Sequence, residues 1–461
     1  AALDSAFLWI AAQRGWRKLD WLAFAGTAVM CVSVNGPPNR AALTAFTPVF
    51  YLLFAVSSGK RLFIAVHCFL LLNSASLWTS SRSESAFGYG LPLMGLSAGG
   101  IAVMRWRNWP QLTSMVVSAA GAAWFFWHGG SAPEMSGLVL PTWLFAIFFA
   151  WLAFRAACIQ GEMPAGELAA FPINAALYFW AVYWLIPKSA HSAAAGLALG
   201  LAALHFGLSY LIRTKAEPNS AEQMNAGIAI VFLTLAIPIQ LSGFGITILW
   251  AMEGAALMWV ATERRAFRFQ VLALGILGCA AVRLQAADLR MSSVHSPLIN
   301  QRLFTAAVCV FAFWAAAWWS RQTEKLSLPL AMAGHYFLLF ALSLEILDWH
   351  SGFSSLESAS LSILFAVYAV LLVALGTRTH TTANRLLGLA LIAAVVLKLY
   401  TYDVWQLELA YRFIAFAALG ALLLTMSFFY SRRRESIATW LKKDDATSPG
   451  ASAVRPPPPP E

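Results

Sequence analysis

The stretch Leu138–Phe154, LVLPTWLFAIFFAWLAF, decides the fold, because it contains no charged residue and is long enough to cross a bilayer. A helix needs roughly 17–25 apolar residues to span the hydrocarbon core. Hydropathy is continuous along this stretch, whereas the strands of a membrane barrel alternate in hydropathy over about 10 residues. The stretch therefore predicts a transmembrane α-helix.

Comparable apolar runs recur on both sides of this stretch. We predict an all-α, polytopic transmembrane helix bundle of about 17 segments joined by short loops, the first segment being partial. The predicted segments are 1–13, 20–35, 41–58, 62–79, 86–104, 110–128, 138–154, 168–187, 193–212, 225–241, 244–262, 269–286, 303–320, 326–347, 356–376, 385–402 and 409–430. The sequence does not begin with Met and its first run is short, so we expect further sequence before Ala1.

The composition supports membrane embedding. The chain is 60% hydrophobic and 11% charged, whereas soluble domains carry about 25% charged residues. We therefore expect a lipid bilayer as its main partner, and no sizeable soluble domain. The net charge of +10 does not indicate nucleic acid binding, because the basic residues are scattered over short loops rather than gathered on one face.

No sequence motif indicates a cofactor or a metal. The five cysteines show no CxxC spacing and the eight histidines no HxxxH spacing, so we expect neither metal nor cofactor. The chain also lacks a phosphate-binding loop. Whether the protein is an enzyme stays open, because distant helices could still assemble a catalytic site.

Lys and Arg alternate between rich and poor loops, and this pattern predicts the topology. The poor set of loops contains only Arg40, Arg82, Lys188, Arg290 and Arg302. Cytoplasmic loops carry the excess of positive charge, so the pattern places the C-terminus in the cytoplasm. The tail 431–461 is basic, then polar, and ends in the run Pro456–Pro460, which predicts a disordered cytoplasmic segment with polyproline II character.

Ionisable residues inside the predicted spans indicate where function could lie. Each costs roughly 2.5–3.5 kcal/mol to insert at mid-bilayer. They concentrate in segments 221–430, whereas segments 1–220 have few, and most fall between the midplane and the outer face. This contrast predicts an outward-facing polar cavity. Its candidate substrate-binding residues are Glu253, Arg283, Asn300, Arg302, Glu345, Lys398, Asp403 and Arg412.

Simpler explanations exist for several of these residues. Arg412 lies four residues after Glu408, so the two could pair along one helix. Lys398 could extend its ammonium group to the interface. His335, alone on an apolar run, is more typical of a hydrogen-bonded core histidine than of a ligand. Glu253 is harder to explain in this way, because neither end of its helix is near.

Five motifs in the C-terminal half resemble a known family. They are WAMEGAALMW (250–259), PLINQR (297–302), SLE (343–345), LKLYTYD (397–403) and YRFIAF (411–416). These motifs resemble the bacterial multi-pass membrane proteins of domain-of-unknown-function family 2339. The resemblance implies a bacterial inner membrane, but no activity. It also implies that Glu253, Asn300, Arg302, Glu345, Lys398, Asp403 and Arg412 are recurring polar positions.

Three functional hypotheses follow. The first is a transporter or flippase-like protein that handles an envelope lipid or glycan precursor through the outward-facing cavity, with cationic residues contacting an anionic headgroup. The second is a membrane-embedded transferase acting on a lipid-linked substrate, with Glu253 or Asp403 as base and Lys398 or Arg412 contacting the leaving group. The third is a scaffold in which the buried charges only hold helices together.

Overall fold

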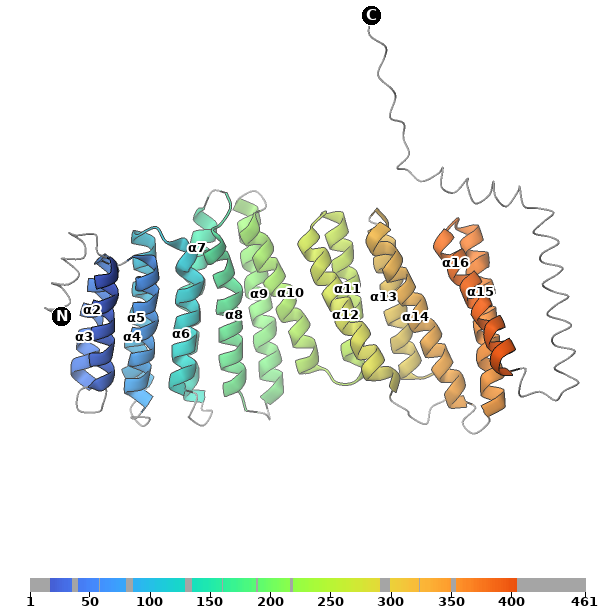
Figure 1. The fold of residues 1–461 in the computed structure, drawn as a ribbon, viewed down its shortest axis with the longest axis horizontal. Coiled ribbons are helices and arrows are strands. Elements are labelled where there is room, and N and C mark those ends of the chain that lie inside the picture. The colour runs from blue at the N-terminus through green and yellow to red at the C-terminus, as the bar shows by residue number, and fades with distance from the viewer. Residues whose placement is uncertain are drawn as a thin grey trace, which may run out of the picture. The chain divides into compact units, whose positions relative to one another are not determined.

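The computed structural model describes residues 17–34, 40–57, 59–79, 86–128, 135–159, 161–187, 190–215, 219–290, 299–322, 324–349 and 354–403. This part of the chain forms 15 α-helices and no strand (Figure 1). The helices are α2 (Arg17–Ser33), α3 (Arg40–Ser57), α4 (Lys60–Thr79), α5 (Ala86–Trp106), α6 (Thr113–His128), α7 (Val139–Cys158), α8 (Ala165–Leu185), α9 (His191–Lys215), α10 (Ser220–Gln240), α11 (Phe244–Glu263), α12 (Phe267–Ala286), α13 (Gln301–Trp319), α14 (Glu324–Trp349), α15 (Ser354–Arg378) and α16 (Thr382–Lys398). Helix α16 continues into a π-helical turn, η7 (Leu399–Asp403).

Every helix coincides with one predicted segment, so the all-α prediction is confirmed for the described residues. Ten of the helices are long and apolar enough to cross a membrane. The predicted segments 1–13 and 409–430 and the tail 431–461 lie outside the described residues. The structure therefore supports a multi-pass helical protein with at least ten candidate spans.

The chain divides into two compact units, Ala1–Glu253 and Gly254–Glu461. In the first unit α9 packs along α10, and α6 lies against both α4 and α8. The core of this unit contains the fully buried side chains of Trp124, Phe148 and Phe171. In the second unit the main contacts are between α13 and α14 and between α15 and α16. The division that the sequence predicts near residue 220 rests on charge distribution and stays a prediction.

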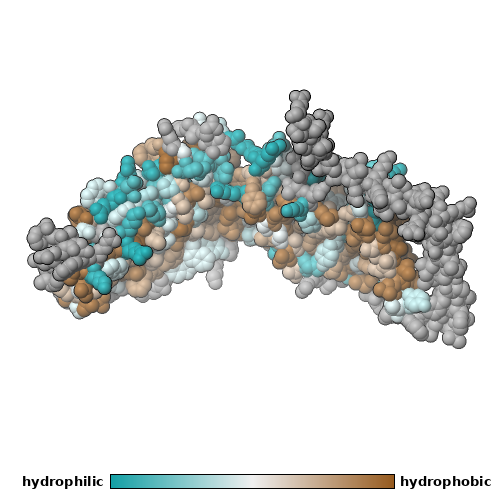
Figure 2. Space-filling model, turned by 45° about the horizontal axis from the view of Figure 1, so that its top comes forward, coloured by the Kyte–Doolittle hydropathy of each residue, from teal (hydrophilic) through white to brown (hydrophobic). Residues whose placement is uncertain are grey.

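Large apolar side chains remain exposed on these helices. Phe206, Trp180 and Phe311 are each more than 60% exposed, at 64%, 63% and 67%. Brown, hydrophobic residues occupy broad stretches of the surface visible in Figure 2. Exposed apolar area on this scale marks a surface that meets lipid or another apolar partner. Together with the ten candidate spans, it indicates that the helices are embedded in a bilayer.

Asparagine side chains cap the N-termini of two helices. Asn219 Oδ1 accepts a hydrogen bond from the backbone N–H of Glu222 at 3.0 Å at the start of α10, and Asn300 caps α13 in the same way. The first backbone N–H groups of a helix have no partner within the helix. A capping side chain supplies one, which is why Asn, Asp and Ser are favoured at this position.

Replacing Asn219 with alanine is expected to lower the free energy of unfolding by about 1 kcal/mol, because the N–H of Glu222 loses its acceptor. Titration of the detergent-solubilised protein with a denaturing detergent, followed by circular dichroism, measures the change. Asn219→Ser is the control, since a serine hydroxyl also caps. If the serine and alanine variants are equally unstable, the cap does not explain the effect.

Candidate functional site

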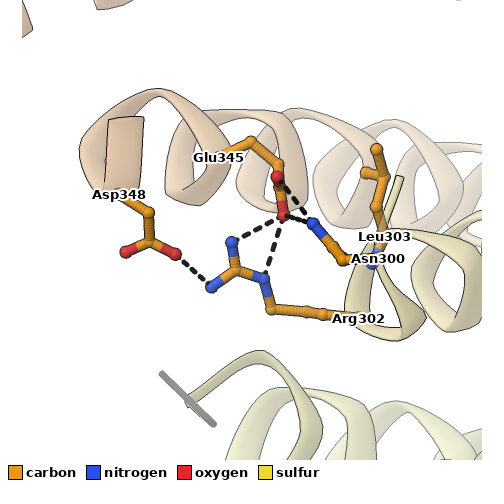
Figure 3. A network of polar contacts seen from close by, with 5 residues as sticks. All are labelled: Asn300, Arg302, Leu303, Glu345 and Asp348. Carbon is orange, nitrogen blue, oxygen red and sulfur yellow. Dashed lines mark hydrogen bonds and ion pairs between the residues drawn. The ribbon is translucent and has the colours of Figure 1, made fainter. Parts of the chain in front are cut away.

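Asn300 connects the start of α13 to a carboxylate on α14 (Figure 3). Its Oδ1 accepts from the backbone N–H of Leu303 at 2.7 Å, which caps α13. Its Nδ2 donates to both carboxylate oxygens of Glu345, at 2.9 Å to Oε1 and 2.8 Å to Oε2. The side-chain amide of Asn300 therefore caps α13 through its oxygen and orients Glu345 through its nitrogen.

Arg302 lies between two carboxylates of α14. Its Nε and Nη2 both donate to Glu345 Oε1, at 3.1 and 2.6 Å, and its Nη1 forms an ion pair with Asp348 Oδ2 at 2.6 Å. The side chains of Arg302 and Glu345 are 5% and 7% exposed, whereas that of Asp348 is 49% exposed. Asn300, Arg302, Glu345 and Asp348 thus form a charged cluster that runs from a buried carboxylate to a half-exposed one.

The cluster joins α13 to α14. Glu345 and Asp348 are three residues apart, so they lie on one face of α14 and both reach the same guanidinium group. Glu345 accepts from Asn300 and Arg302 together, so a buried charge is both paired and hydrogen-bonded, as burial requires. Three of the predicted site residues, Asn300, Arg302 and Glu345, are therefore brought together by the fold.

Glu253 occupies the middle of α11, and its partner comes from α10. Its Oε1 lies 2.8 Å from the hydroxyl of Thr234, and the indole N–H of Trp250 donates to the backbone carbonyl of Thr234 at 3.1 Å. The second carboxyl oxygen, Oε2, is buried and has no hydrogen-bond partner among the described residues. No Lys or Arg of the described chain forms an ion pair with Glu253.

The remaining predicted site residues are placed separately. Lys398 Nζ donates to Ser362 Oγ at 2.6 Å, which joins α16 to α15. Arg283 is partly buried near the C-terminal end of α12. Asp403 is the last residue of η7, and its side chain is outside the description, as is all of Arg412. A single cavity that these residues share stays a prediction.

Charge-based reasoning missed several polar contacts in the first unit. Arg155 Nε and Nη2 donate to the two oxygens of Glu167 at 3.0 and 3.1 Å, a bidentate ion pair between α7 and α8. The prediction begins this helix at residue 168, but α8 begins at Ala165 and includes Glu167. His205 and Asn225 form a buried hydrogen bond of 2.7 Å between α9 and α10. Histidine and asparagine carry no formal charge in the sequence pattern, so the distribution of charged residues does not reveal the contact between His205 and Asn225.

Within the described ranges, no group of three or more His, Cys, Asp and Glu side chains is placed to hold a metal ion. The buried carboxylates of Glu345 and Glu167 instead accept hydrogen bonds from arginine side chains. The contacts at Glu345, Glu167 and Glu253 each join two helices, and Glu253 has one buried carboxyl oxygen without a hydrogen-bond partner among the described residues.

Comparison with known proteins identifies the family. A model of the family described as predicted membrane protein (DUF2339) matches residues 63–354 and, in a second match, residues 270–433. The match is wider than the C-terminal motifs indicated, because it also covers most of the first unit. Neither the curated proteins nor the solved structures gave a match. The chain therefore belongs to the DUF2339 family of predicted membrane proteins and is a multi-pass integral membrane protein.

Proposed function

We propose that this protein is a transporter or flippase-like protein that moves an envelope lipid or glycan precursor, with Glu253 as a proton-carrying group. In this proposal it resides in the bacterial inner membrane with its C-terminus in the cytoplasm. Cationic residues on the outer side, such as Arg283 and Lys398, contact the anionic headgroup of the substrate. The observation that carries the proposal is the environment of Glu253.

Glu253 is a carboxylate at the midpoint of a candidate membrane span, with one hydroxyl as its partner. Intramembrane carboxylates are expensive, and those that persist commonly belong to ion pathways or proton relays. A purely structural carboxylate would be expected to have a cation beside it, as Glu345 has Arg302. The contrast between these two glutamates supports a functional role for Glu253.

The hydrogen bonds around Thr234 support a proton on Glu253. The hydroxyl of Thr234 has one hydrogen and two neighbouring acceptors, Ile230 O at 2.9 Å and Glu253 Oε1 at 2.8 Å. A protonated Glu253 can donate to Thr234, which then donates to Ile230, so both contacts are hydrogen bonds. An ionised Glu253 competes with Ile230 for the single hydrogen. Gain and loss of a proton would therefore rearrange the contact between α10 and α11.

Glu253→Gln is expected to abolish the pH dependence of lipid movement, because glutamine fills the same space but cannot release a proton. Proteoliposomes containing the full chain and a fluorescent phosphatidylglycerol measure this movement. A membrane-impermeant reductant bleaches the label in the outer leaflet, so the rate at which inner-leaflet lipid becomes accessible reports transport. Glu253→Asp is expected to keep a pH dependence, since it retains the carboxyl group.

Glu263→Gln is the matched control, because it makes the same change on an exposed residue at the end of the same helix. It is expected to behave as the wild type. A wild-type protein that moves no labelled lipid at any pH would contradict the proposal. The same conclusion would follow if Glu253→Gln and Glu263→Gln had identical pH profiles.

A scaffold role is the second candidate, and the charged cluster of Asn300, Arg302, Glu345 and Asp348 favours it. Asn300 and Arg302 both donate to Glu345, and Asn300 also accepts from the first turn of the helix that it caps. These contacts join two helices, and Asp348 is the most exposed of the four residues. If substitutions here change stability while lipid movement per folded molecule is unchanged, the cluster is structural.

A further inference from the structure

Helix α5 ends in a basic, left-handed turn. The backbone N–H of Asn108 donates to the carbonyl of Arg105 at 3.4 Å, and that of Trp109 donates to the carbonyl of Met104 at 2.9 Å. Asn108 has a φ of 53°, in the left-handed region that closes this type of helix end and that asparagine tolerates better than most residues. The turn buries Trp109 and leaves Arg105 and Asn108 exposed.

A small polar depression lies beside this turn, where the ends of α5 and α7 meet the start of α8. Its lining includes Arg105 and Asn108 from the turn, Arg155 from the last turn of α7 and Glu167 from the first turn of α8. The cavity volume is about 20 Å³, which is room for one oxygen-sized group. We propose that this depression and its rim bind the phosphate group of an anionic phospholipid. One phosphate oxygen enters the depression, and the rest of the lipid stays outside it.

The lining offers hydrogen-bond donors that a ligand can reach. Arg105 and Asn108 are exposed, and their side chains make no hydrogen bond or ion pair within the described part of the chain. Arg155 is 22% exposed and directs Nε and Nη2 at Glu167, so its Nη1 is still available to donate. A phosphate group accepts from several such donors at once, and hydrogen bonds between charged partners are the strong ones.

The charges around the depression favour an anion. Glu167 is the carboxylate in the lining, and its bidentate contact with Arg155 balances its charge. Arg105 therefore adds a positive charge that no carboxylate of the lining balances. The guanidinium group of Arg107, on the same turn, lies 4.8 Å from the ring centre of Trp109 and adds a further positive charge.

The surroundings of the depression favour a lipid as the source of the phosphate. Trp106 follows Arg105 and is 63% exposed, and Phe154 precedes Arg155 and is 60% exposed. Exposed tryptophan beside basic residues is typical of the membrane interface, where headgroups lie. A phospholipid can place its phosphate at Arg105 and its acyl chains along Phe154, and basic pockets between transmembrane helices bind anionic headgroups in this way. The proposal is independent of any role of Glu253.

Native mass spectrometry of the full chain in detergent tests the proposal, because it resolves how many lipid molecules each protein molecule binds. The probe is phosphatidylglycerol, and phosphatidylcholine, which has no net charge, is the reference lipid. The wild type is expected to bind phosphatidylglycerol more tightly than phosphatidylcholine. Arg105→Gln is expected to weaken phosphatidylglycerol binding about fivefold, the usual contribution of one basic residue near an anionic headgroup.

Arg213→Gln is the matched control, because it removes the same charge from another exposed arginine in the last turn of a helix, α9, in the same unit. It is expected to bind phosphatidylglycerol as the wild type does. Equal losses in Arg105→Gln and Arg213→Gln would overturn the proposal, since they would reflect only the general attraction of basic loops for anionic lipid. A wild type without preference for phosphatidylglycerol would overturn it as well.

Asn108→Gly tests the turn without disturbing its backbone, because glycine adopts a positive φ without strain. It is expected to weaken phosphatidylglycerol binding about threefold, through the loss of one hydrogen bond to the phosphate. Unchanged binding in this variant would overturn the role of Asn108.

Competition with inorganic phosphate separates a lipid from a soluble ligand. Excess phosphate is expected to leave phosphatidylglycerol bound to the wild type, because the acyl chains contribute to the affinity of the lipid alone. If inorganic phosphate displaces phosphatidylglycerol from the wild type but not from Arg105→Gln, the assignment to a lipid is overturned and the depression is a site for soluble phosphate.

Discussion

Arg302→Ala is expected to lower the free energy of unfolding by about 3–5 kcal/mol, the usual cost of removing one partner from a buried ion pair. The variant removes the guanidinium group from Glu345, which is 7% exposed, while the amide of Asn300 still donates to it. The contact between α13 and α14 then loses its buried positive charge. Denaturing-detergent titration of the purified protein, followed by tryptophan fluorescence, measures the loss.

Two further variants show whether the buried pair is the cause. Asp348→Asn removes the half-exposed carboxylate and is expected to cost at most about 1 kcal/mol. The double variant Arg302→Met, Glu345→Leu removes both buried charges, and it is expected to be more stable than Arg302→Ala alone. If Arg302→Ala costs no more than Asp348→Asn, the buried pair does not hold the two helices together.

Arg155→Ala is expected to destabilise the first unit by about 2–4 kcal/mol. This is somewhat less than for Arg302, because Arg155 is 22% exposed and solvent screens part of its charge. Glu167, at 4% exposed, loses both donors of its bidentate contact with α7. Thermal unfolding of the detergent-solubilised protein measures the effect as a lower midpoint temperature.

A conservative change at the same contact is expected to lower the free energy of unfolding by a smaller amount. Glu167→Gln keeps one acceptor oxygen for Arg155 and removes the buried charge, so the expected loss of stability is about 1 kcal/mol. Glu162→Gln is the surface control, because Glu162 is exposed shortly before α8. An Arg155→Ala variant as stable as Glu162→Gln would show that the ion pair contributes nothing to the packing of α7 and α8.

The helices could be predicted from sequence because membrane embedding imposes a simple rule. A backbone in lipid must satisfy its own hydrogen bonds, so each long apolar run becomes a helix. The run 244–262 corresponds closely to α11, Phe244–Glu263. Helix ends were less accurate, as at Ala165, because polar residues such as Glu167 can enter a first turn when a partner from another helix is present.

The partners of the charged residues could not be predicted in the same way. Hydropathy places Glu345 near a helix end and Asn300 before the preceding helix, but it does not say which side chains meet. Those contacts depend on how the helices pack and rotate, which a single sequence does not specify. The polar link between His205 and Asn225 was missed for a different reason, because neither residue adds a formal charge.

Glu253 remains the residue on which the functional proposal depends, and its protonation can be observed directly. Infrared difference spectroscopy between high and low pH, on the protein in lipid nanodiscs, detects the C=O band of a carboxylic acid. We expect such a band in the wild type and in Glu263→Gln, and its loss in Glu253→Gln. An identical difference spectrum in Glu253→Gln would contradict the claim that Glu253 gains and loses a proton within the membrane.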